Sequence, residues 1–363
     1  MVPRWRVVLR SAVAAALCVV ATALVYLVSV RTSWGQQVGN DALAGRGQAG
    51  PESHRAGLDL LGTISVMSLV ASAVGLILLA AVRRRWLVAV GVAVLIGGAN
   101  LTTQVLKRFV LGRPDLLAGP AEFLSNSLPS GHATVAASLA LGLLLVAPPS
   151  LRTVALVAGA LYAGGVGVAV LATGWHRAGD AVAAWGVAGA WTFAVVGALA
   201  ALSPRKPATA AVRAGSGSRS AAAASSTTST SAAAAGSAGA GSAGAPGSAA
   251  SADSATAARA ARAAQAQRRW SERTSWLLGV GAVVTLAVWA SGLLVALVFR
   301  HSTIDQVRNG AAFWSGCAWI VGSLLGLLAL VVWCLREAPV DSAALARPAK
   351  PRQAPVAASL SRK

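Results

Sequence analysis

The chain has 363 residues, of which 56% are hydrophobic and 12% are charged, and its mean hydropathy is +0.65. This composition excludes an ordinary soluble domain of the same size, because too few polar residues remain to cover the apolar ones. The formal net charge of +20 would suggest nucleic acid as the partner of a soluble protein. In a membrane protein, basic residues concentrate in cytoplasmic loops, so we expect membrane lipids and no nucleic acid as partners.

Long apolar runs recur along the chain and predict membrane-spanning helices, since about 20 such residues cross the ~30 Å of hydrocarbon. They lie at 11–30, 60–82, 86–106, 133–146, 153–173, 181–202, 276–299 and 312–335. The fourth run is short, but its polar flanks can extend the helix. The sequence therefore predicts an all-α polytopic integral membrane protein with a six-helix bundle in 1–202 and a C-terminal two-helix hairpin in 276–335.

The first run follows the basic stretch MVPRWR, which is also typical of a secretory signal peptide. The run is followed by VRTSWGQQ rather than by a small-residue cleavage site, so we expect a retained first span. The polar stretch 31–58 is expected to be a long loop on the outer side.

The second half of the chain differs sharply in composition. Residues 203–255 are mostly Ala, Ser, Gly and Thr and predict a disordered cytoplasmic linker. Residues 256–275 predict a basic juxtamembrane helix, either lying on anionic headgroups or simply solvated. Four of its arginines share one helical face: Arg259, Arg262, Arg269 and Arg273. Residues 336–363 predict a disordered cytoplasmic tail.

Three cysteines, Cys18, Cys317 and Cys334, fall inside predicted spans without paired spacing. Neither a disulfide framework nor a zinc site is indicated. The eleven acidic residues include no cluster that suggests a two-metal centre. We therefore expect no metal and no cofactor.

Polar islands stand at the ends of several apolar runs. If the N-terminus is cytoplasmic and every run crosses the membrane, these islands all fall on the outer side, and both termini are cytoplasmic. They contain Lys107, Arg113, Ser130, Gly131, His132, His176 and Asp180. The shared side favours one site over a scatter of unrelated polar groups.

The residue types in these islands suit a phosphate. Ser130 can cap a helix and Gly131 lets the backbone approach a ligand closely, while free N–H groups at a helix N-terminus attract anions. Lys107 and Arg113 can add charge-assisted hydrogen bonds, although a role as interfacial anchors is the alternative. Asp180 follows His176 by four residues, so it can hold one ring nitrogen and leave the other free to attack phosphorus.

Three segments carry a resemblance to a known family: KRFVLGRP (Lys107–Pro114), PSGH (Pro129–His132) and AVLATGWHRAGD (Ala169–Asp180). The chain resembles the type 2 phosphatidic-acid phosphatases of the acid phosphatase and vanadium haloperoxidase superfamily, whose signature is K-x6-R-P, P-S-G-H and S-R-x5-H-x3-D. The resemblance covers 1–202 and implies a lipid-phosphatase-like bundle.

The resemblance also implies residue roles. His176 would attack the phosphoryl group to form a phosphohistidine, Asp180 would orient it, and His132 would protonate the leaving oxygen. The phosphate would be held by Lys107, Arg113, Ser130 and the Gly131 backbone.

The sequence departs from the family pattern at two places. Lys107 and Arg113 are separated by five residues rather than six, and the Ser-Arg pair of the third motif falls on Ala169 and Val170. By analogy with loss of one transition-state donor, the missing arginine is expected to cost about 3 to 4 kcal/mol, unless Arg177 or Arg108 substitutes for it.

The expected function is hydrolysis of a lipid phosphate or polyprenyl pyrophosphate at the outer face of the plasma membrane. The bias to Arg over Lys and to Ala suggests a GC-rich genome and hence a bacterial membrane. Two alternatives stay open: a lipid phosphotransferase that uses the same site, and a non-catalytic lipid-phosphate binder or transporter, which the Val170 departure makes credible. A vanadate haloperoxidase is disfavoured, since its chemistry gives no reason to embed the site in a bilayer.

Overall fold

The computed structural model describes residues 4–117, 128–203 and 302–336, together with part of the residues between 261 and 299. Within these residues the regular structure is all helical, with no strand. Five helices are long and apolar enough to cross a membrane, and a sixth crossing is counted if Ser33–Gly62 and Val66–Val82, which meet at a bend of 62°, form one broken span. The predicted all-α polytopic fold is confirmed.

The helices follow one another with short connections. In chain order they are α1 (Arg4–Arg31), α2 (Ser33–Ala44), the 3₁₀ helix η1 (Gly45–Ala49), α3 (Gly50–Gly62), α4 (Val66–Val82), α5 (Trp86–Val105), the π-helical turn η2 (Leu106–Val110), α6 (Gly131–Val146), α7 (Arg152–Ala172), α8 (Ala178–Leu202) and α11 (Asp305–Leu335). Thr285–Phe299 is a shorter apolar helix, only part of which is described. Nearly all of the predicted linker (203–255), most of the predicted basic helix (256–275) and most of the predicted tail (336–363) lie outside the described residues.

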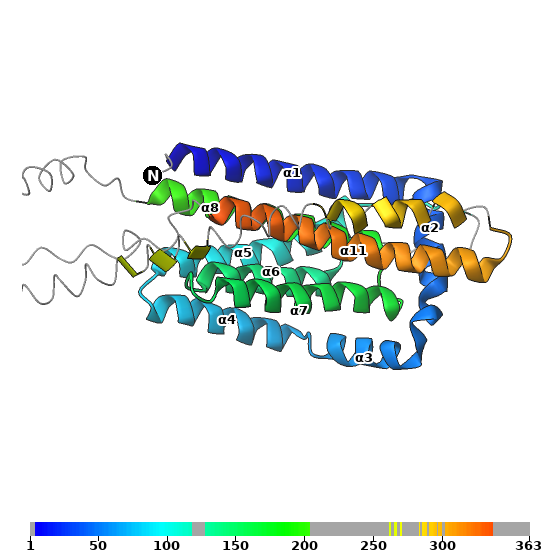
Figure 1. The fold of residues 1–363 in the computed structure, drawn as a ribbon, viewed down its shortest axis with the longest axis horizontal. Coiled ribbons are helices and arrows are strands. Elements are labelled where there is room, and N and C mark those ends of the chain that lie inside the picture. The colour runs from blue at the N-terminus through cyan, green and yellow to red at the C-terminus, as the bar shows by residue number, and fades with distance from the viewer. Residues whose placement is uncertain are drawn as a thin grey trace, which may run out of the picture.

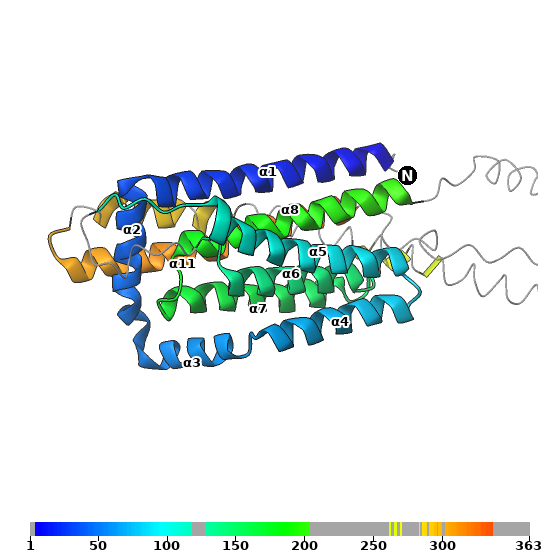
Figure 2. The same cartoon turned by 180° about the vertical axis from the view of Figure 1, so that it is seen from behind.

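The polar stretch 31–58 forms helices instead of the expected loop. Thr32 caps α2 by accepting a hydrogen bond from the Gly35 N–H at 3.0 Å, and α3 has a proline in its first turn, which suits a helix start. The stretch is too polar to span a membrane, but α2 buries Ala42 and Leu43. Figures 1 and 2 show α2 running across one end of the bundle, from α1 on one side toward α3 on the other.

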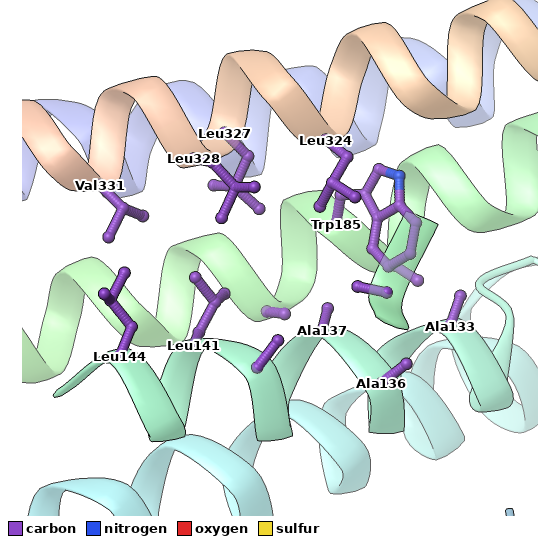
Figure 3. Close-up of a cluster of buried hydrophobic side chains, with 14 of the residues drawn as sticks. Ala133, Ala136, Ala137, Leu141, Leu144, Trp185, Leu324, Leu327, Leu328 and Val331 are labelled. Carbon is purple, nitrogen blue, oxygen red and sulfur yellow. The ribbon is translucent and has the colours of Figure 1, made fainter. Parts of the chain in front are cut away.

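The centre of the bundle is built from α6, α8 and α11. Eleven of the 16 residues of α6 are buried, many of them alanines that allow neighbouring helices to approach closely. In Figure 3, Leu324, Leu327, Leu328 and Val331 of α11 point toward α8 and α6, and the ring of Trp185 lies beside Leu324. The fully buried Trp185 donates its indole N–H to the Ile320 carbonyl at 3.2 Å, which satisfies a polar group in the core.

The helix α11 contacts α2, α7 and α8, so it is part of the bundle although the sequence suggested an appended hairpin. A Cβ atom at Gly167 of α7 would lie 2.7 Å from Ile320 Cγ2, and the glycine therefore permits close packing of α11. The other helix of the expected hairpin packs on α11 as well, because Cβ atoms at Gly292 and Gly326 would lie 3.1 Å from Trp319 and 3.3 Å from Thr285, respectively. The residue that comes later in one helix contacts the residue that comes earlier in the other, as in an antiparallel hairpin.

The two ends of the bundle carry different structures. At the end that holds the N-terminus, the Arg4 and Arg85 side chains donate to the carbonyls of Ala200 and Val146 at 3.1 and 2.9 Å. At the opposite end lie α2, the turn η2, the start of α6 and the connection from α7 to α8 (Figures 1 and 2). Every residue of the predicted phosphate site belongs to this second end.

Candidate active site

The connection from α7 to α8 presents a histidine held by a carboxylate. His176 Nδ1 lies 3.2 Å from Asp180 Oδ2, and both side chains are nearly enclosed, with exposed fractions of 8% and 1%. The same Oδ2 accepts the Arg177 backbone N–H at 3.0 Å, which caps the start of α8. An ionised carboxylate can only accept, so Nδ1 carries the proton and Nε2 keeps its lone pair. Asp180 thus caps α8 and contacts the imidazole that the sequence predicts it to orient.

The tight connection fixes the position of His176. Gly174 adopts a φ of +79°, which favours glycine, and a Cβ atom there would lie 3.1 Å from Cδ and Nε of Arg46. The backbone N–H groups of Gly174 and His176 donate to Leu171 and Val170 at 3.0 and 2.9 Å. The nucleophile candidate therefore stands on a loop with little freedom.

The start of α6 is joined directly to this loop. Ser130 caps α6 through its side chain, and its backbone N–H donates to the Asp180 carbonyl at 2.9 Å. The ring of His132 contacts the ring of Trp175, with centroids 5.2 Å apart, and it lies within electrostatic range of His176 and Lys107. The start of α6 and the connection from α7 to α8 thus bring together the two histidines that are predicted to share one anion.

The Gly131 backbone is open to a ligand. A Cβ atom at this position would meet the side-chain nitrogen of Gln104 at 3.7 Å, an ordinary contact distance. Ser130 is completely buried and its hydroxyl accepts the Ala133 N–H at 3.4 Å, which leaves its proton available for donation. A role of both groups in phosphate binding stays a prediction.

The basic segment before α6 contains an irregular turn. Lys107 lies in η2, a π-helical turn of five residues, and Arg113 follows in the extended stretch after it. The π-turn adjusts the helix at the point where the chain has one residue fewer between Lys107 and Arg113 than the family pattern, and such turns are common at functional sites. The Gln36 side chain and the Tyr26 hydroxyl hold this stretch by donating to the carbonyls of Pro114 and Gly112 at 2.7 and 2.8 Å.

The guanidinium group of Arg113 carries buried hydrogen-bond donors close to this site. Its Nε and Nη2 atoms are buried, and neither has a hydrogen-bond partner among the residues that the structure describes. Burial lowers the pKa of Arg113, and the Asp180 charge opposes that effect. Buried donors without a partner are costly, so this guanidinium is suited to receive an anion.

Arg177 is a second buried cation beside Arg113. Its Nε and Nη2 atoms donate to the Asn40 side-chain oxygen at 3.3 and 3.1 Å. Burial, followed by the charge of Arg113, lowers the pKa of Arg177 to about 10, while Asp180 acts in the opposite direction. Both arginines stay charged at neutral pH, so a phosphate beside them would relieve their repulsion.

Val170 occupies the place of the arginine in the third family motif, and its side chain is completely buried in the hydrophobic core. Arg177 is one of the two substitutes that the sequence suggested, and it lies within electrostatic range of Arg113 and Asp180. No contact of Arg108 with the site is seen in the described part of the chain.

Sequence reasoning missed the contribution of α2. Asn40 reaches Arg177, and Gln36 reaches the stretch that carries Arg113. A Cβ atom at Gly39 would lie 2.9 Å from Arg177 Cδ, so α2 packs directly on this side chain. The available signal was the group of amides in SWGQQVGNDALA, since amide side chains on an apolar helix face need partners.

The described residues contain no group of three or more His, Cys, Asp or Glu side chains that could hold a metal ion. The polar groups that do converge are two histidines, one carboxylate, cationic side chains and the start of a helix. This set can bind a phosphate, supply a nucleophile and supply a proton.

Comparison with known proteins assigns the segment that carries these groups. Residues 85–203 match the family model of the PAP2 superfamily, from just before α5 to just after α8. No curated protein and no solved structure matches the chain. The matched segment contains every residue of the predicted site. Residues 85–203 are therefore similar to the PAP2 superfamily, and this similarity implies phosphatase-type hydrolysis of a lipid phosphate.

Proposed function

We propose that this protein hydrolyses a lipid phosphate or polyprenyl pyrophosphate through a phosphohistidine formed on His176. The observation that carries the proposal is the arrangement of His176, which Asp180 holds at 3.2 Å, beside His132 and the buried Arg113 donors, which have no partner among the described residues. A nucleophile with its proton on Nδ1, a second imidazole and a cationic pocket are the groups that phosphoryl transfer to histidine requires.

The phosphate is bound by Lys107, Arg113, Ser130 and the N–H groups at the start of α6, and Arg177 adds the charge that Val170 does not provide. These donors stabilise the negative charge that builds on the equatorial oxygens during transfer. The number of positive groups suits a dianionic phosphomonoester or a terminal pyrophosphate.

The reaction proceeds in two steps. His176 Nε2 attacks phosphorus, the bond from phosphorus to the leaving oxygen breaks, and protonated His132 donates its proton to that oxygen. Water then attacks the phosphohistidine while His132 accepts a proton from it, and the bond from phosphorus to Nε2 breaks to release inorganic phosphate. Asp180 stabilises the positive charge on the His176 ring in both steps.

The long apolar helices support a multi-pass membrane protein, and the site lies at the end of the bundle away from the N-terminus. We propose that the N-terminus is cytoplasmic and that the site therefore faces the outer side of the plasma membrane. Phosphatidic acid, phosphatidylglycerol phosphate and polyprenyl pyrophosphate are substrates whose tails remain in the outer leaflet while the phosphate enters the site.

The test is phosphate release from these three substrates by the full chain purified in detergent. Replacing the nucleophile by His176→Ala should lower kcat at least about a thousandfold. The control is His54→Ala on α3. The only hydrogen-bonding contact of the His54 ring in the described part of the chain is with the Ala172 carbonyl, at 3.3 Å, so this substitution should change kcat little. A phosphate label trapped on the wild type under alkaline quench should be absent from His176→Ala.

Three results would contradict the proposal in different ways. Undiminished release by His176→Ala would exclude this nucleophile. Transfer of the phosphoryl group to a lipid or sugar hydroxyl in place of water would identify a phosphotransferase. Saturable binding of all three lipids without turnover would identify a lipid-phosphate binder.

A further inference from the structure

A cavity of about 500 Å³ lies alongside the site, within the size range of ligand pockets. Its walls are formed by α1, α8 and α11, and α2 closes it at the site end. Most of the lining is apolar, as in the following residues: Leu24, Val28, Val182, Trp319 and Leu327. Two of its three long walls, α1 and α11, lie outside residues 85–203.

One end of this cavity is cationic. Arg113 and Arg177 both line it, together with Asp180, and the buried Arg113 donors have no partner in the described part of the chain. The cavity therefore adjoins the candidate phosphate site at these three residues. Its ligand must combine an anionic head with an apolar body.

The length of the cavity fits an extended hydrocarbon chain. Along α11 its lining runs from Ala312 to Leu330, and along α1 from Val30 down to Leu17. At about 1.5 Å per residue these walls span roughly 27 and 20 Å, more than half of the ~30 Å hydrocarbon thickness of a bilayer.

Small residues leave room for the cavity and allow two of its walls, α1 and α8, to pack closely. Ala21 and Ser323 line the cavity from opposite walls, where larger side chains would fill it. At Gly186 of α8 a Cβ atom would come within 2.1 Å of Thr22 Oγ1, so the glycine allows α1 and α8 to close against each other.

We propose that this cavity binds one hydrocarbon chain of the lipid phosphate, so that α1 and α11 select the substrate by its tail. The proposal rests on the proposed function for its phosphate end. The occupant is a single lipid whose head contacts Arg113 and Arg177 and whose chain extends toward Leu330. A neutral lipid such as diacylglycerol has no anionic head to contact these two arginines.

The first test fills the cavity. Ala21→Phe and Ser323→Phe should each lower the ratio of kcat/KM for long-chain phosphatidic acid to that for short-chain, water-soluble phosphatidic acid about tenfold, because displacing even two buried CH₂ groups costs about that factor. The matched controls are Ala23→Phe and Val321→Phe, which lie two residues away, on other faces of the same helices and outside the cavity lining. These controls should preserve the wild-type ratio.

A wild type that hydrolyses both phosphatidic acids with the same kcat/KM would overturn the tail site and leave the proposed function intact. The proposed tail site would also be excluded if Ala23→Phe and Val321→Phe lowered the ratio of the two kcat/KM values as much as Ala21→Phe and Ser323→Phe do. Phosphate release from neither substrate would instead overturn the proposed function, and the second test then decides the cavity.

The second test needs no turnover. The His176→Ala chain is photolabelled with phosphatidic acid that carries a diazirine in its long acyl chain, and the labelled peptides are identified. Labelling should concentrate on the cavity faces of α1 and α11 and fall at least about tenfold with the matching diacylglycerol, which lacks the phosphate. Equal labelling by both probes, or uniform labelling of the outer helix faces, would exclude the proposed site.

Discussion

The PAP2 segment and the helices around it contribute different parts of one site. Residues 85–203 carry the groups suited to the chemistry, including the His176 and Asp180 pair and the capped start of α6. The flanking helices carry no such groups, but α2 holds Arg177 and the Arg113 stretch, and α1 and α11 line the apolar cavity. Under the two proposals above, the chemistry and the choice of lipid reside in separate parts of the chain.

Among the tests of this comparison, the largest loss of kcat is expected for a substitution at His132, within residues 85–203. Replacing it by His132→Gln should lower kcat roughly 10²- to 10⁴-fold, because a positioned acid contributes about that factor. The loss should shrink with an aryl phosphate, whose leaving oxygen needs no proton. An equal loss on alkyl and aryl phosphates would contradict the role of His132 as acid.

A somewhat smaller effect is expected at Arg177, which connects the regions. We propose that Arg177 supplies the transition-state donor that Val170 cannot. Arg177→Gln should therefore lower kcat/KM roughly 10²- to 10³-fold, and Arg177→Lys should recover part of the loss. The control is Arg46→Gln, because Arg46 lies against the same loop at Gly174 and donates to the Leu43 carbonyl at 2.7 Å. Comparable losses in both glutamine variants would mean that the loop, and not the charge of Arg177, had been disturbed.

The smallest effect tests the flanking region alone. Asn40→Ala removes the acceptor that holds Arg177 and should raise KM about tenfold to a hundredfold, since a hydrogen bond to a charged group is worth about 1.5 to 3 kcal/mol. Asn40→Asp should raise KM more than Asn40→Ala, because an added carboxylate would compete with the phosphate for Arg177. If Asn40→Asp binds substrate as well as the wild type, α2 does not tune the site.

Much of the site could be predicted because its residues stand in short, chemically specific segments. His176 and Asp180 are four positions apart, and Ser130 precedes an apolar run, so local geometry alone implies the held imidazole and the cap. Local spacing alone does not bring Lys107 and Arg113 to His176, so their predicted roles remain proposals.

The contribution of α2 could not be predicted, for a physical reason. The polar stretch 31–58 has too little apolar surface to indicate a span, and its partners are distant, with Asn40 and Arg177 separated by 137 positions. A helix whose amides are satisfied by a remote loop has no periodic signature in its own sequence. The π-turn at Lys107 is similar, since it depends on the packing of α5 and the stretch that follows it.

The sequence by itself determined that the chain has long apolar helices suited to a membrane, and it singled out the imidazoles and the carboxylate proposed to handle a phosphate. Both follow from residue order, because hydropathy and short-range spacing are properties of the sequence itself. Only the tertiary structure decided that α11 joins the bundle, that Arg177 stands beside Arg113 under α2, and that an apolar cavity continues from the cationic end. These features arise from contacts between residues far apart in the chain, and such contacts depend on how complete helices pack against one another.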